Sequence, residues 1–368
     1  MKYFVVPTLL FCIVSKAFSV DLSDPWILNK SAILDKESPM LLQKYKVPSV
    51  SLALSIDGQI KLLKTIGFQS EKQEANFETL YDTASLGKPI TTEIVLRLAS
   101  DGLISIDEPM AKHWIDPDLK GSPYIDRLTV RKSLIHQTGL PNWRYMTEGK
   151  LKFIKEPGTE RTYSGEGMDY VLKFIESKLS KDFSQLADEY LFQPAGMNNT
   201  FYKAEESIKD RMAHGFIKDQ YIIPKTKMNI SGAGGVRTTA EDYVKFMNSI
   251  MQRQLLNKKT HDERFVIALD EYKINCLKDP EPNTSCPPKL GFGLGWYVYD
   301  YPTERIIGHT GANRDLRTLG LFIPEKKLSL AIFTNGENGN HVINEILKIL
   351  EINEKFILLV SPKTGPNL

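Results

Sequence analysis

The sequence predicts an α/β fold in which both ends of the chain build one antiparallel sheet flanked by helices, with a mainly helical unit inserted between them. Residues 49–67 predict a hairpin, because small or polar residues alternate with apolar ones on either side of the turn signal Asp57-Gly58. Residues 316–334 predict a second hairpin near the C-terminus. Between them, residues 109–226 carry helix and loop patterns without a clear periodic strand.

Other elements are expected in order around this frame. A helix is expected near residues 36–45, and the apolar spacing of residues 86–100, with Gly102 at a C-cap position, predicts a second helix. Thr239 is a candidate N-cap for a helix that follows the insertion. The last elements expected are strands at residues 291–299 and 305–308 and a closing helix at residues 341–350.

The length of the chain is sufficient for a folded protein, and its composition gives no reason to expect a strongly charged partner. The chain has 368 residues, which is enough for a sizeable buried core. Its formal net charge of +2 gives no overall attraction to nucleic acid or to an anionic membrane, so neither is expected as a partner. The predicted units are a signal peptide (1–19), an α/β unit (20–108 and 227–355), an inserted helical subdomain (109–226) and a C-terminal tail (356–368).

The N-terminus predicts an export signal. Lys2 supplies a positive charge, residues 3–14 are nearly continuously apolar, and Ala17 and Ser19 place small residues at the cleavage-recognition positions. Cleavage near Ser19 would make the protein secreted or periplasmic. A membrane anchor is disfavoured because the apolar run is short, and a lipoprotein signal through Cys12 is disfavoured because a bulky residue precedes it. No other segment approaches transmembrane length, so no anchor is predicted in the mature chain.

Cysteine and histidine usage bears on disulfides and metals. Cleavage would remove Cys12 and leave Cys276 and Cys286. Two nearby cysteines in an exported chain predict one local disulfide, and the alternative is two independent thiols. The six histidines are scattered without a His-x-x-x-His pair, and no phosphate-binding glycine loop follows a strand. The sequence therefore predicts no metal and no cofactor.

The segment from Thr83 to Lys88 carries a candidate nucleophile. Ser85 stands at the first turn of a predicted helix, and Lys88, three residues later, lies on the same face. A serine hydroxyl needs a base to take its proton, and a lysine whose pKa is lowered can serve. The helix N-terminus adds backbone N–H groups that favour a developing oxyanion. This spacing alone also describes an ordinary surface helix. Other motifs in the sequence are needed to distinguish a catalytic pair from such a helix.

Further motifs follow the serine and lysine in order along the chain, at residues 134–141, 156–165, 234–242, 291–296 and 308–311. With them the sequence resembles the serine β-lactamase-related family, which includes class C β-lactamases, D-alanyl-D-alanine carboxypeptidases and related esterases. That family pairs a Ser-x-x-Lys helix with a Tyr-x-Asn-like loop and a Lys/His-Thr-Gly strand. The resemblance covers roughly residues 46 to 351 and implies a β-lactamase/transpeptidase-like fold acting on a small-molecule or peptide substrate.

The resemblance implies a role for each matching residue. Ser85 would be the acylated nucleophile, Lys88 would assist its deprotonation, and Tyr163 would act as phenolate base or proton shuttle. The alternative for Tyr163 is a packed loop tyrosine. The backbone N–H groups of Ser85 and Ala312 would form the oxyanion hole.

The Lys/His-Thr-Gly motif has two candidates in this chain. We assign it to residues 309–311, where His309 and Thr310 would bind the polar end of the substrate and Gly311 would keep the strand open to ligand. The literal Lys-Thr-Gly of residues 363–365 follows the closing helix at the extreme C-terminus, where chain ends are seldom ordered.

The chain departs from the family pattern at two positions. Gly165 stands where Tyr-x-Asn has an amide side chain, which puts β-lactam and peptide substrates in doubt and predicts a roomier pocket. His309 replaces the lysine that is usual in β-lactamases and is less reliably charged at neutral pH. Arg314 and Arg317 could supply a clamp for a substrate carboxylate, or they could be two solvated loop arginines.

Two classes of function remain open from the sequence. The first is an exported serine hydrolase that forms an acyl-enzyme on ester, D-amino-acid amide or β-lactam substrates. The second is a catalytically silent penicillin-binding or sensor module on the same fold. Retention of Ser85, Lys88 and Tyr163 together favours the hydrolase.

Overall fold

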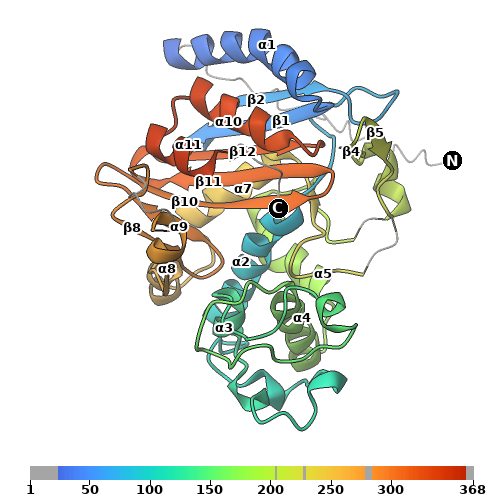
Figure 1. Ribbon diagram of the computed structural model, residues 1–368, viewed down its shortest axis with the longest axis vertical. Coiled ribbons are helices and arrows are strands. Elements are labelled where there is room, and N and C mark those ends of the chain that lie inside the picture. The colour runs from blue at the N-terminus through green and yellow to red at the C-terminus, as the bar shows by residue number, and fades with distance from the viewer. Residues whose placement is uncertain (1–23, 204, 227–228, 278–283, 362–368) are drawn as a thin grey trace, which may run out of the picture.

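The computed structural model describes residues 24–203, 205–226, 229–277 and 284–361 (Figure 1). Its centre is an eight-stranded antiparallel sheet of order β2-β1-β12-β11-β10-β9-β8-β7. The N-terminal hairpin joins the C-terminal strands, since Ala53 of β1 lies opposite Ala331 of β12. The strands are β1 (Ser49–Ile56), β2 (Gln59–Gly67), β7 (Leu269–Asp270), β8 (Lys289–Phe292), β9 (Tyr297–Asp300), β10 (Arg305–Asn313), β11 (Leu316–Ile323) and β12 (Leu328–Thr334).

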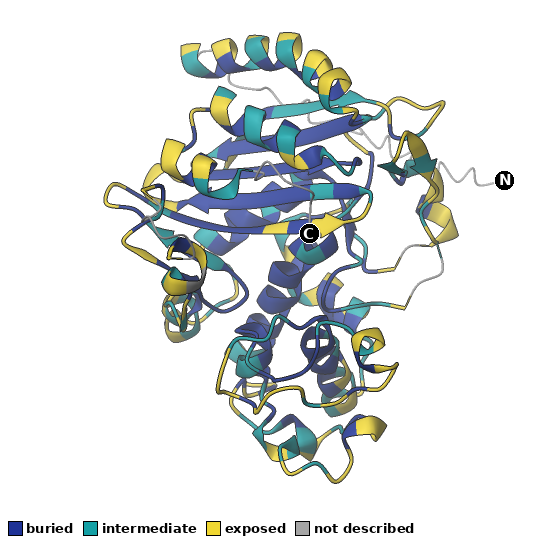
Figure 2. Cartoon of the chain, in the orientation of Figure 1, coloured by how far each residue is buried: buried dark blue, intermediate teal, exposed yellow. Residues whose placement is uncertain are grey.

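Helices cover both faces of the sheet, which is therefore the buried middle layer (Figure 2). Along β12, Leu330 and Ile332 face α1 and α10, whereas Ala331 and Phe333 belong to the apolar core on the side of α2 and α7. This alternation is the period of two expected of a strand buried on both faces. The covering helices are α1 (Pro25–Tyr45), α10 (Gly339–Ile349) and α11 (Glu354–Val360) on one face, and α2 (Gly87–Ser100) and α7 (Ala240–Met251) on the other.

A mainly helical unit lies below the sheet in Figure 1, and α2 extends from the sheet toward it. Its helices are α3 (Val130–Leu134), α4 (Gly165–Leu179), α5 (Phe183–Ala187) and α6 (Gln193–Ala195). Elsewhere lie α8 (Lys258–Arg264), α9 (Tyr272–Cys276) and the paired strands β3 (Tyr81–Asp82) with β6 (Arg237–Thr238) and β4 (Gly215–Ile217) with β5 (Gln220–Ile222). Short helical turns are η1 (Ala84–Leu86), η2 (Met110–Lys112), η3 (Pro117–Leu119), η4 (Ile125–Arg127), η5 (Arg144–Thr147), η6 (Asp188–Phe192), η7 (Glu206–Arg211) and η8 (Pro324–Lys326).

The predicted fold class is confirmed, and both hairpins form as the sequence predicts. Asp57 and Gly58 have φ angles of 53° and 76°, which is the left-handed pair that a tight hairpin turn requires. Thr239 caps α7 by accepting the N–H of Asp242 at 3.2 Å. The boundaries of the predicted units stay a prediction, and the predicted export signal and residues 363–365 lie outside the described residues.

Three elements differ from the expectation. Helix α1 begins eleven residues before residue 36, at Pro25, where Asp24 caps it by accepting the N–H of Trp26 at 2.9 Å. The short hairpin β4–β5 lies in the segment expected to lack strands, because three-residue strands are too short to show a period. Helix α11 occupies part of the expected tail, because buried Phe356 and Ile357 pack on the core beneath α1 and α10.

A disulfide joins Cys276, at the end of α9, to Cys286, just before β8. The two cysteines are 10 residues apart in sequence. We expect a Cys276→Ser/Cys286→Ser variant to lose about 3 kcal/mol of unfolding free energy, because the open loop restores conformational entropy to the unfolded chain. Urea denaturation measures this loss. Alkylation of the native protein without reductant should modify neither cysteine, and two modified thiols would contradict the bond.

Candidate active site

Ser85 lies in the turn η1, directly before α2, and opens into a pocket of about 630 Å³. The preceding residue, Ala84, has a φ angle of 46°, a strained value for a residue with a side chain. Ala84 N donates to Asp82 Oδ1 at 2.7 Å, and Asp82 pairs with Arg237 at 3.0 Å. These contacts hold the sharp turn and leave the Ser85 side chain half-exposed.

Lys88 lies one turn further along and points back at Ser85. Its Nζ lies 3.1 Å from Ser85 Oγ and donates to the carbonyl oxygen of Ala233 at 2.7 Å. The side chain is only 1% exposed, and among the described residues it has no carboxylate partner. The local spacing therefore produces the serine–amine contact that the sequence predicts, with the amine shielded from water.

The structure brings Tyr163 to this pair from the loop before α4. The ring centroid lies 4.9 Å from Lys88 Nζ, and the ring packs against His136 with the centroids 4.3 Å apart and the planes tilted by 40°. Arg161 lies on another side, with its guanidinium carbon 5.6 Å from the ring centroid. Three residues predicted to act together thus meet in space, although Tyr163 is 75 or more positions from both partners in the chain.

A buried ion pair next to Tyr163 was missed by the sequence analysis. Arg161 Nε lies 2.5 Å from Glu271 Oε1, and the guanidinium also donates to the hydroxyl of Tyr297 at 2.6 Å. Glu271 is 1% exposed and stands just before α9, the helix that ends in the disulfide. No local pattern marks Glu271, because its partner lies in a distant loop.

The His309 side chain is buried rather than part of the pocket wall. It is 3% exposed, and its Nδ1 donates to the carbonyl oxygen of Thr310 at 2.7 Å. Burial, reinforced by the charge of Lys88, lowers the pKa of His309 to about 3, so the ring is neutral at physiological pH. On the same strand, Thr310 and Ala312 are exposed, and Ala312 lines the pocket with Ser85. Their shared pocket is what an oxyanion hole from these two N–H groups requires, and that role stays a prediction.

Gly311 serves a different purpose from the one expected. A Cβ at this position would lie 2.1 Å from the carbonyl oxygen of Thr83 and 2.3 Å from Thr318 Oγ1. The glycine therefore lets β10 press against the turn that carries Ser85, and the space beside it is filled by protein rather than kept for ligand.

The expectation of a roomier pocket at Gly165 is wrong. Gly165 begins α4, and its N–H is held by Asn142 Oδ1 at 3.0 Å. A Cβ on Gly165 would lie 2.6 Å from Cη2 of Trp143, so the indole already occupies the place of the missing side chain. The sequence could not reveal this contact, which joins two loops.

Neither arginine of the predicted clamp lines the pocket. Arg317 donates to the carbonyl oxygens of Asn313 and Leu316, and Arg314 is exposed to solvent. The cationic side chains on the wall are instead Lys225 and Arg237.

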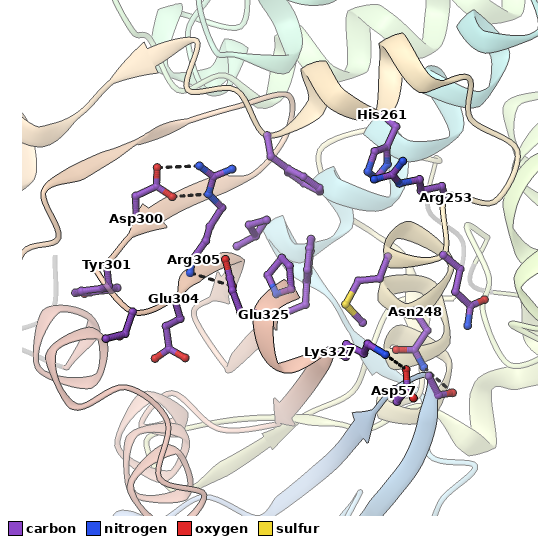
Figure 3. A pocket seen from close by; sticks show the side chains of 18 of the residues that line it. Asp57, Asn248, Arg253, His261, Asp300, Tyr301, Glu304, Arg305, Glu325 and Lys327 are labelled. Carbon is purple, nitrogen blue, oxygen red and sulfur yellow. Dashed lines mark hydrogen bonds and ion pairs between the residues drawn. The ribbon is translucent and has the colours of Figure 1, made fainter.

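A larger cavity of about 720 Å³ lies elsewhere, near the turns that follow β9 and β11 (Figure 3). It shares no lining residue with the Ser85 pocket, and its charged side chains include the ion pairs of Arg305 with Asp300 and of Lys327 with Asp57. The described residues hold no cluster of three or more potential metal ligands. Nor does any helix in the described part of the chain have the length and apolarity to cross a membrane.

The chain resembles known proteins both in sequence and in fold. The family model described as Beta-lactamase matches residues 35–352. The chain is 24% identical over 363 residues to penicillin-binding protein 4* of Bacillus subtilis (strain 168), covering 88% of this chain and 76% of that protein. It is 22% identical over 346 residues to the D-alanyl-D-alanine-carboxypeptidase/endopeptidase AmpH of Escherichia coli (strain K12), covering 83% and 86%. The solved structure of a class C beta-lactamase superposes with a TM-score of 0.70 at 18% identity, covering 88% of this chain and 96% of that chain.

Two buried histidines beside the site make stability depend on pH. Burial, with the nearby charges of Lys88 and Arg161, lowers the pKa of His136 well below 6.5, as burial does for His309. Between about pH 6.5 and pH 3 the unfolded chain therefore binds protons that the folded chain does not, and the unfolding free energy falls as pH falls. We expect His309→Gln to reduce this slope by up to one proton, about 1.4 kcal/mol per pH unit. Urea denaturation of both proteins across this range tests it, and parallel curves would contradict it.

Proposed function

The chain belongs to the beta-lactamase family, and from that premise we propose that it is an exported serine hydrolase that works through an acyl-enzyme on Ser85. The observation that carries the proposal is the 3.1 Å contact between Lys88 Nζ and Ser85 Oγ at a pocket wall. In such an arrangement the buried amine can take the proton of the serine hydroxyl as the oxygen attacks.

The proposed acyl transfer uses the positions of Ser85, Lys88 and Tyr163 in the following way. Ser85 Oγ attacks the carbonyl carbon of the substrate while its proton passes to Lys88, with Tyr163 as base or shuttle. The negative oxygen that forms accepts hydrogen bonds from the N–H groups of Ser85 and Ala312. Collapse of this intermediate breaks the bond to the leaving group, which takes the proton. Water then attacks the acyl-enzyme by the reverse path and frees Ser85.

We propose small esters or D-amino-acid amides as substrates, with β-lactam turnover slow or absent. Acylation needs the nucleophile, base and oxyanion hole, whereas β-lactam and peptide recognition needs polar contacts, and Gly165 lacks the amide that would supply one. The values of kcat/KM for nitrocefin, p-nitrophenyl butyrate and a D-Ala-D-Ala peptide should be compared on one preparation. A nitrocefin value of about 10⁷ M⁻¹s⁻¹ or above would make the protein a true β-lactamase.

The alternative is a catalytically silent penicillin-binding module. Incubation with a fluorescent penicillin and a fluorophosphonate, followed by peptide mass spectrometry, separates the two. Labelling of Ser85 by the fluorophosphonate with turnover of an ester supports the hydrolase. A stable penicillin adduct without turnover of any substrate supports the silent module.

Export is part of the proposal and rests on the charged, apolar and small-residue pattern of residues 1–19. The N-terminus of the protein recovered from medium or periplasm, read by mass spectrometry, tests it. Cleavage near Ser19 supports export, and a retained Met1 contradicts it.

A further inference from the structure

Trp143 covers the start of α4 on the wall of the Ser85 pocket. The indole is half-buried and lines this pocket together with Asn142. A Cβ on Gly165 would lie 2.6, 2.7 and 2.9 Å from Cη2, Cζ3 and Cζ2 of Trp143. These distances are too short for a real contact, so the indole must move from this position before a side chain at position 165 can fit.

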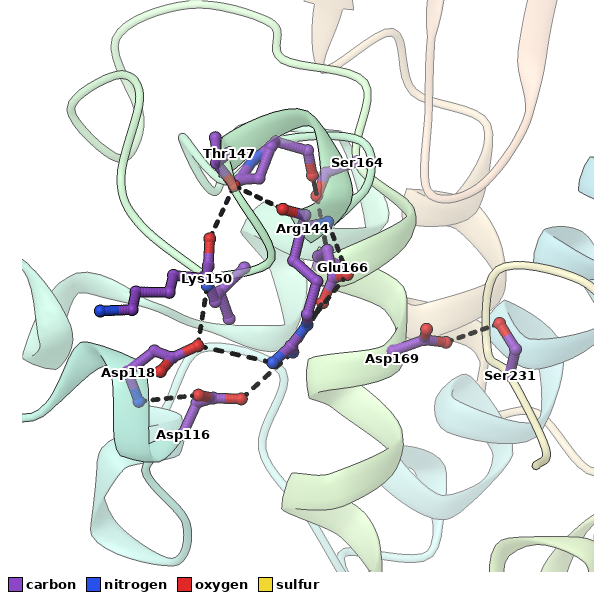
Figure 4. Close-up of polar contacts among 12 residues, drawn as sticks. Asp116, Asp118, Arg144, Thr147, Lys150, Ser164, Glu166, Asp169 and Ser231 are labelled. Atoms are coloured by element: carbon purple, nitrogen blue, oxygen red, sulfur yellow. Dashed lines mark hydrogen bonds and ion pairs between the residues drawn. The ribbon is translucent and has the colours of Figure 1, made fainter.

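The residues on both sides of Trp143 are bonded to the same helix start, and Figure 4 shows the contacts of Arg144 with Glu166. Asn142 accepts the N–H of Gly165, with its Oδ1 at 3.0 Å. Arg144 donates through its backbone N–H to Glu166 Oε1 at 2.9 Å, and its guanidinium contacts Glu166 Oε2 at 2.8 Å. Asp116 holds the same guanidinium at 3.3 Å. The backbone of Trp143 is therefore anchored on either side, which fixes the place from which the indole reaches the pocket wall.

Three of the four charged side chains that line the pocket are used within the protein, and the fourth is the exposed Lys225. Asp82 and Arg237 pair with each other at 3.0 Å. Asp169 accepts the hydroxyl of Ser231 at 2.7 Å and the N–H of Gly232 at 2.8 Å. The indole of Trp143 adds a large aromatic surface to this wall, and Tyr202 and Ile230 also line the pocket, together with polar side chains such as Asn142.

On the premise of the proposed acyl transfer, we infer that Trp143 makes the site selective for substrates with an apolar acyl group, an alkyl chain or an aromatic ring. An indole offers a large flat surface that stacks on rings and buries aliphatic chains. A polar acyl side chain finds no amide at position 165 with which to form a hydrogen bond. The free-energy cost of removing its hydration water is therefore not offset there.

The first test compares acyl groups. We expect the wild-type kcat/KM for p-nitrophenyl butyrate and benzoate to exceed that for the acetate by at least about 10-fold, and Trp143→Ala to remove most of that preference. Tyr145→Ala is the matched control, because Tyr145 stands on the same turn, is 75% exposed and does not line the pocket. An unchanged acyl preference in Trp143→Ala overturns the inference.

Labelling separates this inference from the proposed function. If the wild type, Trp143→Ala and Tyr145→Ala all react with a fluorophosphonate at Ser85, the acyl-transfer machinery is intact. The acyl preference alone then tests the inference about Trp143. If the wild type neither reacts nor turns over any ester, the proposed function fails and the inference falls with it. Trp143→Phe guards against a misfolded alanine variant, since it should keep a preference between those of wild type and Trp143→Ala.

The second test exchanges the two side chains. Gly165→Asn alone should be destabilised or inactive, because its Cβ meets the indole. The double variant Trp143→Ala/Gly165→Asn should recover folding and raise penicillin labelling relative to ester turnover. A Gly165→Asn single variant with wild-type melting temperature and acyl preference would show that the two positions do not compete, and would overturn the inference.

Discussion

Replacing Ser85 with alanine is expected to abolish covalent labelling and turnover while leaving the melting temperature close to that of the wild type. Ser85 is half-exposed, so its hydroxyl adds little to the core. Lys88 keeps its bond to the carbonyl oxygen of Ala233 at 2.7 Å, so the buried amine is not left without a partner. The rate should fall to the background of hydrolysis that the pocket supports without a nucleophile.

Ser100→Ala is the matched control for this variant, because Ser100 lies at the far end of the same helix, α2. Fluorophosphonate labelling, ester turnover and thermal melting should be measured on all three proteins. Ester or amide turnover at the wild-type rate in Ser85→Ala would refute the assignment of the nucleophile. Loss of activity in Ser100→Ala would mean that the helix, rather than the hydroxyl, is responsible.

Replacing Lys88 with methionine is expected to lower the acylation rate by about 10²–10⁴-fold. Methionine fills a similar volume, so the buried position loses its amine without a large cavity. Arginine is not a conservative replacement here, because it stays charged and cannot take a proton. The rate should be read from single-turnover labelling, which isolates acylation from later steps.

Tyr163→Phe supplies the companion measurement. Because Lys88 Nζ lies 4.9 Å from the Tyr163 ring, the two residues should act as one unit. The double variant is then expected to be little slower than the poorer single variant, since parts of one unit give non-additive losses. Multiplied losses in the double variant would show independent roles. Acylation by Lys88→Met within a few-fold of wild type would remove Lys88 from the mechanism.

The alternation along β10 separates the buried from the exposed residues of the site. His309 and Gly311 are two residues apart on β10, so a period of two places them on one face and Thr310 with Ala312 on the other. The structure buries the first pair and exposes the second. The alternation places His309 and Thr310 on opposite faces, so the two side chains cannot both line one wall of the pocket.

Features that depend on neighbours along the chain follow from local sequence. The Asp57-Gly58 hairpin follows from the turn that these two residues adopt, and the Ser85–Lys88 contact follows from their spacing on one helical face. The start of α1 is equally local, because Asp24 caps the first turn of the helix and Pro25 follows it.

Features made by segments that lie far apart in sequence depend instead on the three-dimensional packing of the chain. The indole of Trp143 lies on Gly165, the Arg161–Glu271 ion pair flanks Tyr163, and the strand at Gly311 presses on the Ser85 turn. Each such contact depends on the packing of separate loops and strands in three dimensions. Periodicity, capping and spacing report only what happens within one element, so no pattern in the chain could show these contacts.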